Sequence, residues 1–190
     1  MNILNIHGYG GNPHNAAYTA LQKNGCSKVT APAIDYDTQS PEIILERLQN
    51  IIADKQINLI IGTSLGGFYA SVLSAQHNLP VMLVNPCLTP FLLDLLSELE
   101  KNSLVQLFNK LEKIELSNVS CIVGDADELL GNHAFTEKLL GNARFRRIKD
   151  GKHSGYTLPL KAFFSEMLQY YMAILPLKEG AECISSDLSD

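Results

Sequence analysis

The segment 57–70 constrains the fold of this chain more than any other part of the sequence. Its aliphatic run stops at Gly62, and Ser64 stands two residues before Gly66, in a G-x-S-x-G pattern. This pattern predicts a buried strand that turns sharply into a helix, with the Ser64 hydroxyl projecting from a strained turn. The two glycines lack the Cβ atoms that would collide where the strand and the helix pass each other closely. We therefore predict an exposed, strained serine at the carboxyl end of a central strand.

Two backbone N–H groups near Ser64 are candidates to bind negative charge. Leu65 falls in the first turn of the predicted helix, where its N–H has no intrahelical partner and the helix dipole favours an anion. The glycine-rich loop 7–13 supplies the second candidate, the N–H of Tyr9. The loop does not complete G-x-G-x-x-G, because Pro13 stands at the last glycine position, and no G-K-[ST] follows. Nucleotide binding is therefore not expected.

Length and composition exclude several classes of protein. The chain has 190 residues, which is typical of one domain, and a formal net charge of −5. An acidic chain without a basic patch is not expected to bind nucleic acid. The four cysteines follow no metal-binding spacing and suit reduced thiols; they are Cys26, Cys87, Cys121 and Cys183. We expect no metal ion and no organic cofactor, and, in the absence of a secretory signal, a cytoplasmic location.

Residues 56–93 contain no Asp, Glu, Lys or Arg, so a hydropathy window marks them as a possible membrane span. Polar residues interrupt this stretch, and its length matches a strand, a helix and a second strand. A parallel sheet that is covered on both faces has such apolar strands. We therefore predict the centre of a sheet and no membrane span.

Expected strands alternate with expected helices along the chain. The strands are expected at 2–7, 28–33, 57–62, 81–84, 119–123 and 143–148. The helices are expected at 15–23, after Ser40, from Leu65 to His77, and at 91–101, 103–114, 133–140 and 157–173. This order predicts a six-stranded, mostly parallel sheet with helices on both faces, in which ligands bind beyond the carboxyl ends of the strands.

Between residues 90 and 118 two amphipathic helices are expected, although one helix would be enough to connect the fourth and fifth strands. We expect an acyl pocket lined by Leu104, Leu107, Phe108 and Leu111. The alternative is that these side chains simply complete the core.

The single domain is expected to span 1–175. The acidic tail 176–190 has no periodicity and is expected to be disordered.

A serine hydroxyl needs a base to become a nucleophile, and five histidines are candidates. His153 follows the last strand on a glycine-flanked loop at the carboxyl edge, and it completes the chain order nucleophile, acid, base. His133 follows the fifth strand and is the alternative. His77 falls at the opposite edge of the sheet, His7 is expected to pack below its own loop, and His14 is expected at the surface.

The base needs a carboxylate that fixes its tautomer. The loop after the fifth strand offers Asp125 and Asp127. Asp127 is the expected partner, because Asp125, one residue after Gly124, has the position of a residue that bonds its own turn. In the alternative interpretation both residues are helix caps, and Asp94 is the acid.

Four motifs together resemble the α/β-hydrolase superfamily, and in particular the compact bacterial esterases of the YqiA and YcfP type. They are His7-Gly-Tyr-Gly-Gly-Asn-Pro13, Gly62-Thr-Ser-Leu-Gly-Gly-Phe-Tyr-Ala70, Asn85-Pro-Cys87 and Gly124-Asp-Ala-Asp-Glu128. The resemblance implies a minimal α/β-hydrolase fold and a serine esterase acting on carboxylic esters or thioesters of fatty acids. It also implies roles for five residues: Ser64 as nucleophile, Asp127 as acid, His153 as base, and Tyr9 and Leu65 as oxyanion donors.

The expected partner is therefore a small acyl ester or thioester, and the expected assembly is a monomer or a small homo-oligomer. The competing hypothesis is a catalytically silent hydrolase fold that binds a ligand or a protein, since a fold does not dictate a function.

Overall fold

The computed structural model describes residues 1–93 and 98–186, and within these ranges all side chains except those at 98–99 and 174–186. Six strands form one sheet in the order β2-β1-β3-β4-β5-β6, and every neighbouring pair is parallel. The strands are β1 Ile3–Ile6, β2 Val29–Thr30, β3 Leu59–Thr63, β4 Val81–Val84, β5 Val119–Gly124 and β6 Arg144–Ile148. The predicted six-stranded parallel sheet is therefore confirmed.

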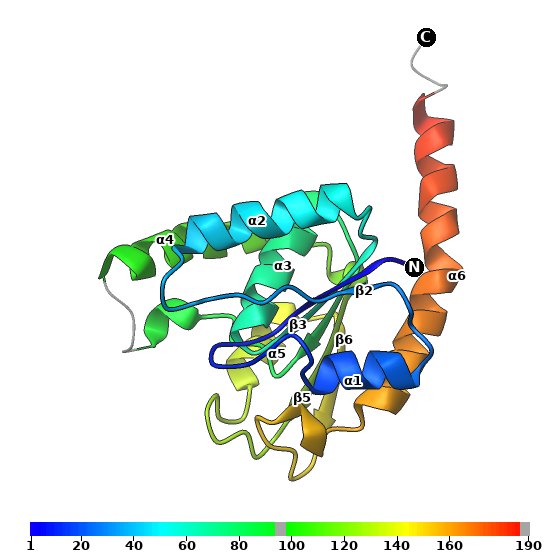
Figure 1. The fold of residues 1–190 in the computed structure, drawn as a ribbon. Helices are drawn as coiled ribbons and strands as arrows, with labels where there is room; N and C mark the ends of the chain where they lie inside the picture. The colour runs from blue at the N-terminus through cyan, green and yellow to red at the C-terminus, as the bar shows by residue number, and fades with distance from the viewer. Residues whose placement is uncertain (94–97, 187–190) are drawn as a thin grey trace.

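Helices cover both faces of this sheet (Figure 1). The α-helices are α1 Ala16–Lys23, α2 Pro41–Asp54, α3 Leu65–His77, α4 Glu98–Phe108, α5 Ala134–Leu140 and α6 Leu160–Ser186. Four short 3₁₀ helices join them: η1 Pro90–Leu92, η2 Asn109–Lys113, η3 Leu116–Asn118 and η4 Gly155–Thr157. Helices α2, α3 and α4 pack on one face, and α1 and α6 pack on the other.

The strands divide their side chains between two cores, one on each face. In β3, Ile60 packs with the helices α2 and α3, whereas Leu59 and Ile61 pack with α1 and α6. This alternation is the period of two that a strand imposes. Because both faces of the sheet are covered, its central strands are apolar throughout, which accounts for the uncharged stretch in the sequence. In the described part of the chain, no helix combines the length and the apolar character needed to cross a membrane.

Local signals set the starts of α1 and α2. The side chain of Asn15 accepts a hydrogen bond from the N–H of Tyr18 at 2.9 Å, and that of Ser40 caps α2, which has Pro41 in its first turn. Such caps satisfy N–H groups that have no partner within the helix.

The structure corrects the expected helices between residues 90 and 118. Instead of two helices divided at residue 102, η1 is followed by one α-helix, α4, which runs through Asn102 and Ser103. Leu104 and Leu107 are buried one turn apart, and this packing outweighs the weak helix propensity of the two polar residues.

Two further boundaries differ from those expected. The second strand is only Val29–Thr30, and α6 begins at Leu160, after η4 and Pro159, rather than at Thr157. Helix α6 also continues to Ser186, beyond the expected end near residue 173. The domain boundary at 175 and the disorder of the tail 176–190 stay predictions.

Candidate active site

Ser64 occupies the sharp turn between β3 and α3. Its φ is 52° and its ψ is −124°, a conformation that a residue with a side chain rarely adopts. A Cβ atom added at Gly62 would lie 2.5 Å from the Gly66 carbonyl oxygen, and one added at Gly66 would lie 2.4 Å from the carbonyl oxygens of Ile6 and His7. Glycine at both positions therefore lets α3 start directly against β1 and β3.

Hydrogen bonds hold the strained serine in place. Its N–H donates to the carbonyl oxygen of Val84 at 3.1 Å. Its own carbonyl oxygen accepts from the N–H groups of Gly67 at 2.8 Å and Cys87 at 3.0 Å. The surrounding structure thus stabilises the backbone conformation that turns the hydroxyl outward.

The loop after β1 lies directly against Ser64. A Cβ atom at Gly8 would lie 2.7 Å from Ser64 Cβ, so only glycine allows this approach. Below the loop, the buried His7 accepts a hydrogen bond from the Ile34 N–H at Nε2, 3.0 Å away. Its Nδ1 therefore carries the ring proton and donates to the Gly8 carbonyl oxygen at 2.8 Å. His7 supports the loop, as expected from the sequence.

Tyr9 and Leu65, whose N–H groups are the expected anion donors, line the same cavity as Ser64. Leu65 is the first residue of α3, so its N–H has no partner within the helix. In the described loops and turns, the Tyr9 N–H donates no backbone hydrogen bond. Both N–H groups therefore stay candidates for binding an anionic oxygen.

A chain of hydrogen bonds connects Ser64, His153 and Asp127. His153 Nε2 lies 3.1 Å from Ser64 Oγ, and His153 Nδ1 lies 2.8 Å from Asp127 Oδ2. Because an ionised carboxylate only accepts, Nδ1 carries the proton, and the lone pair of Nε2 faces the serine hydroxyl. The arrangement can move the serine proton to His153.

Asp127 is buried and remains an anion. Burial raises the pKa of its carboxyl group, but hydrogen bonds from His133 and His153 and from the N–H groups of Leu130 and Leu129 outweigh this and hold the pKa well below its usual range. The two N–H groups donate to Oδ1 at 2.8 and 2.9 Å. Asp127 therefore keeps both its charge and its orientation.

Asn85, directly after β4, connects the end of β5 with the loop after β6 that carries His153, and sequence reasoning did not assign it this role. Its side-chain nitrogen donates to the carbonyl oxygens of Lys152 and His153, both at 2.9 Å. Its side-chain oxygen accepts from the Gly124 N–H at 2.8 Å. Asn85 follows β4 directly and has a φ of 42°, which asparagine tolerates better than most residues. The signals in the sequence were its place at the end of a strand and its part in the Asn85-Pro-Cys87 motif.

The other candidate residues have different surroundings. Asp125 is exposed and accepts a hydrogen bond from the Asp150 N–H at 2.6 Å, so it joins two loops instead of touching a histidine. His133 contacts Asp127 at 2.8 Å. His14 and His77 are exposed. Asp94 lies outside the described residues.

A cavity of about 310 Å³ opens beside Ser64. Of the four side chains expected to form an acyl pocket, only Leu104 lines it. Leu107 and Leu111 are buried in the core, and Phe108 packs edge-on against Phe91. The sequence did not indicate the other walls, which include Tyr36, Gln39, Pro41, Ile44, Tyr69 and Glu100.

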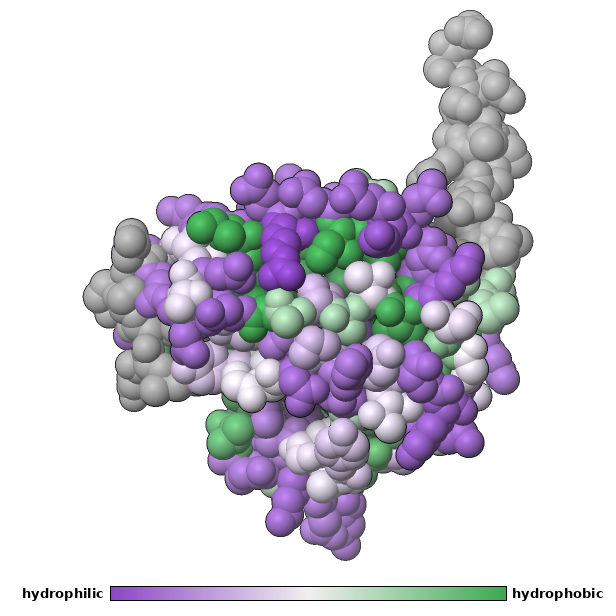
Figure 2. Space-filling model, viewed as in Figure 1, coloured by the Kyte–Doolittle hydropathy of each residue, from purple (hydrophilic) through white to green (hydrophobic). Residues whose placement is uncertain are grey.

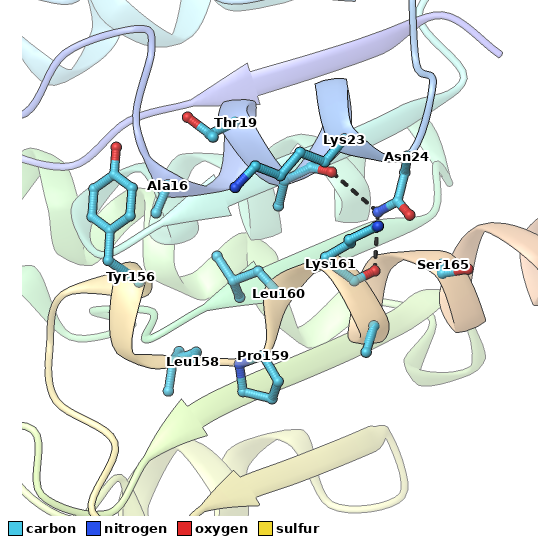
Figure 3. Close-up of a pocket in the computed structure, with 13 residues that line it drawn as sticks. Ala16, Thr19, Lys23, Asn24, Tyr156, Leu158, Pro159, Leu160, Lys161 and Ser165 are labelled. Carbon is cyan, nitrogen blue, oxygen red and sulfur yellow. Dashed lines mark hydrogen bonds between the residues drawn. The ribbon is translucent and has the colours of Figure 1, made fainter.

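A larger cavity, of about 530 Å³, lies between α1 and the start of α6 (Figure 3). Asn24 joins the two helices beside it, because its side chain donates to the carbonyl oxygens of Ala20 and Lys161. None of Ser64, Asp127 or His153 lines this cavity. Ser64 and His153 line the smaller cavity, which is therefore the candidate site.

Viewed as in Figure 1, the described surface is largely hydrophilic, with hydrophobic residues gathered along α2 (Figure 2). Within the described residues, His, Cys, Asp and Glu side chains do not gather in groups of three or more that could hold a metal ion.

Comparisons with known proteins agree with this fold. Residues 2–134 match the family described as an uncharacterised protein family, UPF0227. No curated protein matches the chain in sequence. Est1E from Butyrivibrio proteoclasticus is similar in structure, with a TM-score of 0.62, 17% identity and 88% coverage of each chain.

Two further solved structures are similar at comparable levels. The esterase domain of a Rhodothermus marinus protein has a TM-score of 0.62 and 15% identity, over 90% of this chain and 85% of that one. The α/β hydrolase MGS-MChE2, from a metagenome of lagoon sediments at Mar Chica, Morocco, has a TM-score of 0.57 and 14% identity, over 90% and 91%. On the sequence match and the shared architecture, the chain belongs to the UPF0227 family and has the α/β-hydrolase fold.

Proposed function

We propose that the protein is a serine esterase that hydrolyses carboxylic esters or acyl thioesters through an acyl-enzyme on Ser64. The observation that carries this proposal is the hydrogen-bonded chain from Ser64 Oγ through the His153 ring to Asp127 Oδ2, with distances of 3.1 and 2.8 Å. Nucleophile and base within hydrogen-bond reach, with the base oriented by a third group, is the geometry that acyl transfer requires.

In the proposed reaction, His153 Nε2 takes the proton of Ser64 as the hydroxyl oxygen attacks the ester carbonyl carbon. The tetrahedral oxyanion accepts hydrogen bonds from the N–H groups of Tyr9 and Leu65. His153 then returns the proton to the leaving alcohol or thiol, and an acyl group remains on Ser64. Water repeats the two steps with His153 as the base, releasing a carboxylic acid and free Ser64.

The acidic and apolar features of the site support this substrate class. Asp127 stays ionised and stabilises the imidazolium form of His153 in each half-reaction. The cavity beside Ser64 is about 310 Å³, with walls that include Tyr36, Ile44 and Leu104. A mainly apolar cavity of this size suits the acyl group of a small ester. Similar structures that are named esterases also favour this chemistry.

The test is covalent capture by a fluorophosphonate, which reacts with activated serines. The purified protein, Ser64→Ala and the control Ser27→Ala, at an exposed loop position, are incubated with the reagent and their intact masses are read. We expect one adduct on the native protein and on Ser27→Ala, mapped to Ser64, and none on Ser64→Ala. Ser64→Ala should also lower kcat on a p-nitrophenyl ester by about 10⁴-fold or more.

The absence of an adduct would contradict the proposed function. If the native protein takes no adduct under conditions that label a reference hydrolase, Ser64 is not activated. The protein is then a silent hydrolase fold that binds its ligand without turnover, and ligand capture replaces kinetics.

A further inference from the structure

Two histidine rings share a single oxygen of Asp127. His153 Nδ1 and His133 Nε2 each lie 2.8 Å from Asp127 Oδ2. The His133 side chain is 1% exposed and the carboxylate is 0% exposed, whereas the His153 side chain, which faces the cavity, is 16% exposed. Because the carboxylate only accepts, His133 Nε2 carries a proton and donates it. The described contacts of His133 do not include Ser64.

The backbone around His133 is held for this contact. His133 has a φ of 54°, which is uncommon for a residue with a side chain, and it directly precedes α5. The Gly131 N–H donates to the Asp127 carbonyl oxygen at 3.0 Å, and the Glu137 N–H donates to the His133 carbonyl oxygen at 2.9 Å. Arg147 on β6 bonds the Asn132 carbonyl oxygen and pairs with Glu137. These contacts hold the His133 ring in place against Asp127, as expected for a buried hydrogen-bond network.

We propose that His133 is a positioning residue that acts on the reaction through Asp127 and sets how strongly that carboxylate supports His153. This proposal rests on the proposed esterase function. An oxygen that accepts from two donors divides its negative charge between them, so each donor gains less than it would alone. With His133 present, the imidazolium form of His153 is stabilised less, and His153 stays an effective base at lower pH.

Few other titratable or charged groups face this pair. Glu128 accepts the His153 N–H at 3.2 Å, and the hydrogen bonds that it accepts lower its pKa, so it stays ionised. Cys87 lines a small cavity with His133, and burial raises the pKa of its thiol to about 11, so it stays neutral. Arg147 and Glu137 are paired with each other.

The experiment measures kcat/KM on a p-nitrophenyl ester from pH 5 to 9 for the native protein, His133→Leu and His133→Gln. Leucine removes the donor, whereas glutamine retains an N–H that can reach the carboxylate. We expect His133→Leu to move the acid limb of the profile to higher pH, because the carboxylate charge then acts on His153 alone. We also expect it to lower kcat about tenfold, because the buried carboxylate loses one of the hydrogen bonds that fix its orientation toward His153. His133→Gln should restore both in large part. His77→Gln, at an exposed position far from the site, is the matched control.

Two outcomes overturn the proposal. If both variants lose kcat equally while the acid limb stays in place, His133 only fills space. If His133→Leu does not fold, ¹⁵N NMR of the native protein decides, and a His133 ring without a proton on Nε2 contradicts the proposal. Fluorophosphonate labelling of the native protein separates the esterase function from the role of His133. If Ser64 takes the adduct but the pH profile of His133→Leu does not move, only the role of His133 is contradicted.

Discussion

The two halves of the candidate site are held in place by different forces. Around Ser64 the backbone packs so closely that added Cβ atoms at Gly62 and Gly66 would lie within 2.5 Å of other atoms. Around Asp127 and His153, hydrogen bonds between the loops after β4, β5 and β6 hold the side chains. The serine half should therefore be sensitive to added volume, and the acid and base half to changed polarity.

The largest expected effect is the fall in kcat of Asp127→Asn, which tests whether Asp127 or Asp125 is the acid. The change keeps the volume but favours the wrong tautomer of His153, so we expect kcat to fall about 10⁴-fold. The paired variant Asp125→Asn keeps an oxygen for the Asp150 N–H and should change kcat by less than about threefold, as expected for an exposed surface contact. Ester hydrolysis at pH 7.5 measures both. Equal losses in the two variants would return the choice of acid to an open question.

Gly66→Ala tests the serine half by volume alone. The new Cβ would lie 2.4 Å from the carbonyl oxygens of Ile6 and His7, which belong to the central sheet and its loop and cannot move aside. We expect the free energy of unfolding to fall by about 3 kcal/mol. Gly10→Asn is the control, because Gly10 has open space and a φ of 63° that asparagine tolerates. Urea unfolding of each variant gives the two values, and a Gly66→Ala protein as stable as the native one contradicts the packing account.

Asn85→Ala tests the acid and base half by polarity alone. The change leaves the Gly124 N–H and the Lys152 and His153 carbonyl oxygens without their buried partner. We expect a loss of about 2 kcal/mol in stability, typical of an unsatisfied buried group, and a clear fall in kcat as the His153 loop shifts.

Asn24→Ala is the matched control for this variant. It also removes an asparagine that bonds two carbonyl oxygens, but beside the cavity in Figure 3 and away from Ser64. It should lower stability by about 1 kcal/mol with kcat unchanged. If Asn85→Ala lowers only stability, as Asn24→Ala does, Asn85 does not position His153.

The difference between the halves also explains what the sequence could predict. The turn at Ser64 is encoded locally, because a strand, two glycines and a helix stand together in the chain. The positions of Asp127 and His153 follow from a general rule, since the carboxyl ends of parallel strands meet at one edge. These residues could be proposed from the sequence, and the structure brings their side chains together.

The supporting contacts could not be predicted in the same way. That His133 and His153 reach the same oxygen, and that Asn85 connects the end of β5 with the loop after β6, depends on how loops distant in the sequence pack. The cavity wall was wrongly predicted for Leu107 and Leu111, because helical periodicity indicates an apolar face without saying whether it meets a cavity or the core.

The smallest expected effect is the loss of stability at low pH, and it tests the difference between the serine half and the acid and base half of the site. The folded-state pKa of Asp127 lies below its ordinary value of about 3.9, so its contribution to stability is complete above about pH 5. The contribution is lost as pH falls from there toward the folded-state pKa. The stability gap between the native protein and Asp127→Asn should therefore narrow between pH 5 and pH 3.5. The gap for Gly66→Ala, which involves no titrating group, should stay constant. Urea unfolding at both pH values measures the two gaps; parallel behaviour would mean that charge contributes no more to the acid and base half than to the serine half.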